Sequence, residues 1–128
     1  MIAVQVEPDY DLTVVTISEK LMPDLIGQII RQKNYGITTR VLWDLRHARL
    51  NELNQEHLKQ IAIRIRPAME SRATRGTAVI TSDFRAQAVV EEYFTIARQI
   101  FGRTGFLFVS TSRASAMAWL DEVVPITG

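Results

Sequence analysis

Polar side chains that could bind an anion follow three of the predicted strands. In chain order they are Asp44 with Arg46, Ser82 with Asp83, and Ser112 with Arg113. The carboxyl ends of parallel strands meet at one edge of a sheet, where helix N-termini also present free N–H groups. We therefore expect these residues to form a polar rim that could hold an anion or a phosphorylated small molecule.

The same residues also have a purely structural interpretation, which we favour. Ser, Thr and Asp are preferred at helix N-caps, and each cap stabilises its helix by about 1 kcal/mol. Ser82 or Asp83 would then cap one helix, and Thr111 or Ser112 would cap another. Any α/β chain places such residues after its strands, so the sequence leaves both interpretations open.

No catalytic or metal motif stands out. The chain has no cysteine and two histidines, and its glycines match neither a phosphate-binding loop nor a dinucleotide fingerprint. Asp44 and His47, three residues apart, form no recognised acid–base pair, and Ser110 and Ser112 lack the elbow of serine hydrolases. We predict no catalytic residue, no metal and no cofactor, and we expect Asp44 to anchor a loop by accepting backbone N–H bonds.

Composition places the chain among globular proteins, with 47% hydrophobic and 23% charged residues. No apolar stretch approaches the roughly 20 residues needed to span a bilayer, and MIAVQVEPDY lacks the pattern of a signal peptide. We expect a cytoplasmic protein, with a bacterial origin as the simplest assignment.

The net charge of +1 argues against a dedicated nucleic-acid binder. Twelve of the 15 basic residues are arginine. Arg64, Arg66, Arg72 and Arg75 fall close together, which indicates either a local basic patch or the solvated face of a helix.

Hydrophobic periodicity and turn residues predict a single α/β domain over residues 1–128, in the order β-β-α-β-α-β-α-β-α. Strands are expected over 2–6, 12–17, 41–45, 77–81 and 106–109, and helices over 22–34, from Asn51 or Asn54 onward, over 83–101, and from 110–112 onward. Strands three to five follow helices, so we expect them to be parallel in a mixed sheet that helices cover. Pro67 should kink its helix or end the regular part near Arg66.

This order, together with VLWDL in strand three, GTAVITSD at strand four and the late SRASAMAWLDE, resembles the STAS-type fold of sulfate-transporter and anti-sigma-factor-antagonist domains. The similarity covers about Val4 to Glu122 and is greatest to stand-alone bacterial STAS/Sec14-like domains. The resemblance implies either a partner kinase that phosphorylates a serine after strand three, or an enclosed lipid or other apolar ligand. The segment LRHARLNELNQ has Leu53 or Asn54 near the acceptor position, so we do not expect the phosphorylation switch.

The helix over 83–101 is more apolar than one sheet requires. Beside a core-facing stripe that includes Tyr93, it carries Val90, Phe94 and Phe101, which widen the apolar arc to roughly 160°. These three residues either pack under a neighbouring helix, which we favour, or form a surface for a homodimer, a partner protein or a membrane surface.

Three functions stay open. The first is a non-enzymatic regulatory or binding module that acts through protein contacts, with a homodimer and an unknown protein as the expected partners. The second is a carrier of a small apolar or lipid-like ligand. The third, which we favour least, is an enzyme that uses the polar rim.

Overall fold

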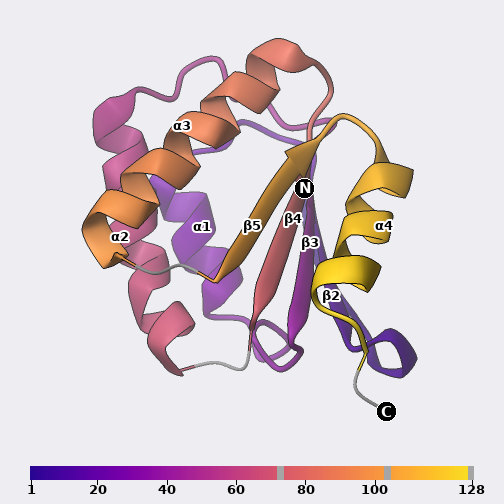
Figure 1. Ribbon diagram of the computed structural model, residues 1–128. Helices are drawn as coiled ribbons and strands as arrows, with labels where there is room; N and C mark the ends of the chain where they lie inside the picture. The colour runs from indigo at the N-terminus through magenta and orange to yellow at the C-terminus, as the bar shows by residue number, and fades with distance from the viewer. Residues whose placement is uncertain (72–73, 103–104, 127–128) are drawn as a thin grey trace.

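A computed structural model describes residues 1–71, 74–102 and 105–126, with side chains from 67 to 71 left out. Its centre is a five-stranded sheet in the order β1-β2-β3-β4-β5 (Figure 1). The strands are β1 (Ile2–Glu7), β2 (Leu12–Ile17), β3 (Arg40–Asp44), β4 (Gly76–Ile80) and β5 (Phe106–Ser110). β1 is antiparallel to β2, and the other neighbours are parallel. The predicted α/β class, element order and mixed sheet are therefore confirmed.

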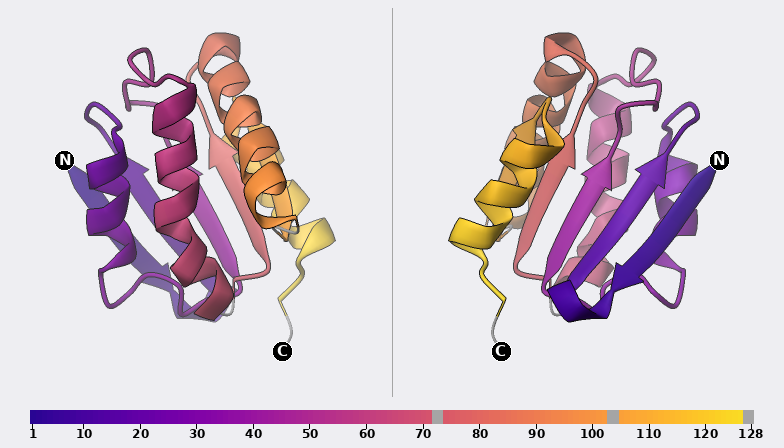
Figure 2. Two further views of the ribbon diagram at one scale, coloured as in Figure 1. Left: turned by 90° about the vertical axis from the view of Figure 1, so that its left-hand side faces the viewer. Right: turned by 90° about the vertical axis from the view of Figure 1, so that its right-hand side faces the viewer.

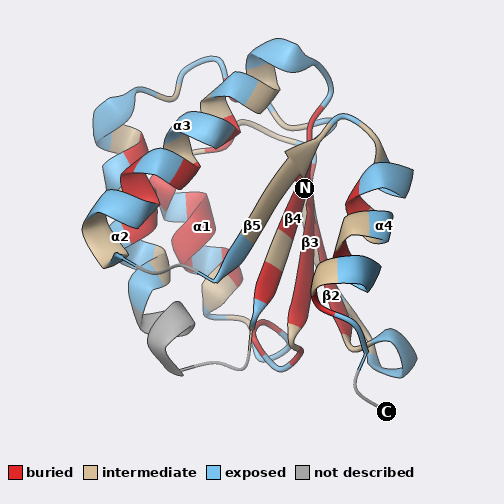
Figure 3. Cartoon of the chain, in the orientation of Figure 1, coloured by how far each residue is buried: buried red, intermediate tan, exposed pale blue. Residues whose placement is uncertain are grey.

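Helices cover both faces of the sheet in unequal numbers. α1 (Pro23–Ile30), α2 (Gln55–Ser71) and α3 (Phe84–Phe101) lie on one face, and α4 (Arg113–Val123) lies alone on the other (Figure 2). Side chains alternate along each strand, so Val41 and Trp43 of β3 face the three helices while Leu42 faces α4. The buried residues thus form one core on each side of the sheet (Figure 3).

The β1–β2 connection begins at Pro8 as predicted and forms a short 3-10 turn, Pro8–Tyr10. Asp11 follows with φ of 47°, a left-handed conformation that Asp tolerates better than most residues. Its carboxylate accepts a hydrogen bond from the backbone N–H of Thr39 at 3.0 Å, which ties the turn to the start of β3.

Arg40 joins this turn to α4 from inside the protein. Its side chain is 1% exposed, and it donates to Asp121 Oδ1 at 2.7 Å and to the carbonyl of Tyr10 at 2.9 Å. The Nε of Arg40 has no hydrogen-bond partner among the described residues. The Arg40–Asp121 ion pair therefore links β3, the first turn and the last helix.

One predicted helix boundary was wrong, and of the two outcomes expected at Pro67 the end of the helix did not occur. The first helix ends at Ile30 instead of Asn34, because the chain turns inward to place the buried Tyr35 edge-on against Trp43, at 5.9 Å between ring centroids. α2 continues past Pro67 to Ser71, so its regular part does not end near Arg66. Pro67 has no N–H to donate to the carbonyl of Ile63, and Ile63 is 58% exposed, so the missing hydrogen bond lies on the solvent side of α2.

Candidate functional site

The polar rim at the carboxyl ends of the strands is occupied by interactions within the protein. Arg46 donates to both carboxylate oxygens of Asp44, from Nε at 2.9 Å and from Nη2 at 2.7 Å. The backbone N–H of Arg46 also donates to Asp44, at 3.1 Å, as expected for a loop anchor. The Arg46 guanidinium, with a smaller contribution from the charge of Arg113, lowers the pKa of Asp44.

Two of the other four rim residues, Asp83 and Ser112, are helix caps. Asp83 accepts a hydrogen bond from the N–H of Ala86 at 2.8 Å at the start of α3, and Ser112 accepts one from Ser115 at 3.2 Å at the start of α4. Ser82 and Arg113 are exposed beside these caps. The rim thus has the helix caps that the structural interpretation predicts. Among the described residues its one ion pair, Asp44 with Arg46, joins two residues of the rim itself.

The Asp44–Arg46 pair should make stability depend on pH. Asp44→Asn is expected to lower the free energy of unfolding by about 1 kcal/mol at pH 7. The folded pKa of Asp44 is lowered, so its contribution is present above the unfolded value of about 3.9 and is lost as pH falls through the folded value. Urea denaturation at pH 7 and at about pH 2.5, well below the unfolded pKa, should show a smaller difference between the two proteins at the lower pH. An undiminished difference would contradict the assignment.

The apolar residues of α3 lie mostly inside the monomer. Val90 is buried, and so is Phe94, with 5% of its surface exposed. Neither side chain is available to a homodimer face or a membrane surface in this fold. Phe101 is half-buried at the end of α3, and the guanidinium of Arg66 lies 5.8 Å from its ring centroid. Val90 and Phe94 therefore pack inside the monomer, which is the alternative that the sequence favours.

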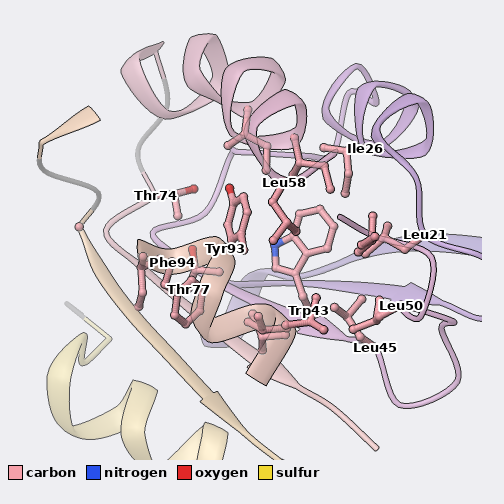
Figure 4. A pocket seen from close by; sticks show the side chains of 18 of the residues that line it. Leu21, Ile26, Trp43, Leu45, Leu50, Leu58, Thr74, Thr77, Tyr93 and Phe94 are labelled. Carbon is pink, nitrogen blue, oxygen red and sulfur yellow. The ribbon is translucent and has the colours of Figure 1, made fainter. Parts of the chain in front are cut away.

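A cavity of about 320 Å³ lies between α2, α3 and the sheet (Figure 4). Its walls are mainly aliphatic and aromatic side chains from both helices, from β3 to β5 and from the loops beside them. They include Leu58, Ile61, Val79, Val89, Val90, Phe94, Phe101 and Leu107. Native cores contain few voids larger than a water molecule, so a space of this volume is unusual for a core.

A few polar groups converge on this apolar space. Figure 4 shows the indole nitrogen of Trp43 on the side of its ring that faces Tyr93, with Thr74 and Thr77 nearby. No described residue forms a hydrogen bond with the Trp43 indole N–H, the Tyr93 hydroxyl or the Thr77 hydroxyl, whereas Thr74 Oγ1 donates to the carbonyl of Thr38 at 3.3 Å. Burial, with a smaller effect of Tyr35, raises the pKa of Tyr93, so its hydroxyl stays neutral and can donate.

Sequence reasoning does not identify Trp43, Tyr93 or Thr77 as site residues. It predicts Trp43 in a buried strand and Tyr93 in a core-facing stripe, and both predictions agree with the structure, where Trp43 is buried and Tyr93 packs against the core. The available signal was the excess apolar width of α3, which followed from Val90, Phe94 and Phe101. All three line the cavity.

Comparisons with known proteins give no assignment, since no family model, curated protein or solved structure matches the chain. Across residues 1–71, 74–102 and 105–126, no helix is long and apolar enough to cross a membrane. The same residues contain no cluster of three or more His, Asp or Glu side chains arranged to bind a metal ion.

Proposed function

We propose that this domain is a non-enzymatic binding module that holds one small, mainly apolar ligand in the cavity between α2, α3 and the sheet. The observation that carries the proposal is a mainly apolar cavity onto which the polar groups of a few side chains, those of Trp43, Tyr93 and Thr77, converge. A mainly apolar pocket with a few convergent polar groups is typical of small-molecule sites.

The cavity volume limits the size of the ligand. Small-molecule pockets range over roughly 300 to 1,000 Å³, and a value near 320 Å³ is at the lower end of that range. A compact molecule with one apolar body fits this volume better than a lipid with two acyl chains. This proposal agrees with the apolar-ligand function implied by the STAS/Sec14 resemblance, which itself stays a prediction.

A regulatory role through protein contacts also stays a prediction, but two of the three side chains expected at its interface are not exposed in the structure. Val90 and Phe94 are core residues of the monomer. A homodimer or partner surface would therefore have to use other side chains. The described structure favours the ligand-binding alternative because Val90, Phe94 and Phe101 all contribute to the cavity.

Ligand capture should be detectable without knowing the ligand. Freshly purified protein is expected to show a discrete noncovalent adduct in native mass spectrometry, which disappears on denaturation. After delipidation, the neutral fluorophore N-phenyl-1-naphthylamine should bind at a single saturable site with increased emission, because the cavity removes it from water. A clean apo mass together with no saturable uptake of the fluorophore would contradict the proposal.

A further inference from the structure

The two ends of the cavity differ in chemistry. At the end near the carboxyl ends of the strands, the lining residues are leucines from the loops beside the sheet. These are Leu21, Leu45, Leu50 and Leu53. The opposite end, where β4 and β5 begin, is lined by Arg66, Thr74, Arg75 and Thr77. A bound molecule therefore meets hydroxyl and guanidinium groups at one end only.

The charge at this polar end is positive. Two arginines line the cavity, and its described lining contains no Asp or Glu. Arg75 forms none of the ion pairs of the described residues, although it is exposed beside the cavity. Arg64, two residues before Arg66 in α2, instead pairs with Asp24 at 2.9 Å. The polar end is thus suited to a negatively charged group.

The backbone holds Arg75 at this position. Its N–H donates to the carbonyl of Thr39 at 2.7 Å, and its carbonyl accepts from Phe106 at 3.1 Å. Gly105 has φ of 74°, and a Cβ atom there would lie 2.9 Å from the Arg75 carbonyl, so glycine permits this close approach. Arg75 therefore projects from a fixed point between β3 and β5 at the end of the cavity.

We propose that the ligand is an amphipathic carboxylate of compact size, with its carboxylate at Arg75 and its apolar part directed toward Leu45 and Leu50. This inference rests on the proposed ligand-binding function and specifies the chemical class of the ligand. Arginine binds carboxylates through two parallel, charge-assisted hydrogen bonds, which neutral head groups cannot match. The hydroxyls of Thr77 and Tyr93 are placed to bind the oxygens or the first polar substituent of such a molecule.

Trp43 provides an optical reporter for the test. The chain has two tryptophans, and Trp119 lies on the other face of the sheet, stacked on Phe108 at 5.1 Å between ring centroids. Trp119→Phe leaves Trp43, in the cavity wall, as the single source of indole fluorescence. This variant would be titrated at pH 8 with decanoate and with decanol, which have the same chain length and differ in head-group charge.

We expect decanoate to bind more tightly than decanol, and Arg75→Gln to weaken decanoate binding about tenfold while leaving decanol binding unchanged. Arg64→Gln, on the same helix as Arg66 but paired with Asp24, is the matched control and should change neither affinity. Equal binding of both compounds, unaffected by Arg75→Gln, would overturn the carboxylate assignment but leave the proposed function standing. Failure of both compounds and of the neutral fluorophore to bind would overturn both. Circular dichroism should show that each variant is folded.

Discussion

Asp121→Ala is expected to lower the free energy of unfolding by about 3 kcal/mol, because it leaves the Arg40 guanidinium buried without its carboxylate. Arg40 is 1% exposed, whereas Asp121 is 64% exposed, so the cost arises almost entirely on the arginine side. The carbonyl of Tyr10 remains as an acceptor, but it carries no full charge. Chemical denaturation monitored by far-UV circular dichroism would measure the loss.

The second half of the test is a double mutant. Replacing a buried ion pair by apolar groups of similar volume is often nearly neutral, whereas removing one partner is costly. Arg40→Met combined with Asp121→Ala should therefore recover most of the stability lost by Asp121→Ala alone. If adding Arg40→Met to Asp121→Ala lowers the free energy of unfolding further instead of raising it, the buried charge of Arg40 is not the cause of the loss. Glu122→Ala, at the next position of α4, is the surface control and should have little effect.

Val79→Phe is expected to abolish ligand binding while changing the free energy of unfolding by no more than about 1 kcal/mol. Val79 faces the cavity from β4, so the larger ring enters existing space and removes the volume that a ligand would occupy. Val41→Phe is the matched control, because Val41 lies on the same face of the adjacent strand but outside the cavity lining. Overpacking at that fully buried position should cost roughly 1–3 kcal/mol.

Both variants would be compared by urea denaturation and by saturation with N-phenyl-1-naphthylamine. Retained fluorophore binding by Val79→Phe would contradict the location of the site. Equal destabilisation by the two substitutions would show that the space beside Val79 is filled in solution. A small loss of stability in Val79→Phe and a larger one in Val41→Phe would show that an unfilled cavity lies beside Val79, because a close-packed core cannot accept a phenyl ring without moving its neighbours.

Much of the fold could be predicted because its signals are local. Alternating apolar residues, Asn54 and Asp83 at helix starts, and Gly102 after the long helix all depend on a few neighbouring residues. Asn54 accepts a hydrogen bond from the N–H of His57 at 2.9 Å, and Gly102 ends α3 with φ of 76°. The rim residues could likewise be located at the strand ends, and their use as caps follows from their side-chain chemistry.

The cavity and the Arg40 ion pair could not be predicted, since each depends on distant segments. Periodicity shows that Trp43 and Tyr93 point inward, but the space between them is set by how far α2 and α3 stand from the sheet. Arg40 and Asp121 are 81 positions apart in the chain, and no local pattern links a residue at the start of a strand to one near the end of the last helix. Pro67 is the opposite case, a strong local signal that gives the wrong expectation. Proline usually ends a helix, but α2 continues through Pro67 to Ser71, where Ile63 on the preceding turn is exposed to solvent.

The cavity also has a consequence for how much folded protein a cell would contain. Side chains that line an unfilled apolar space lack packing partners on one side, so they contribute less to stability than they would in a filled core. Any compound that fills the space stabilises the folded state by mass action, and differences of 1–2 kcal/mol change steady-state abundance several-fold. The level of this protein would then follow the supply of its ligand, through protection from proteolysis and without any change in synthesis.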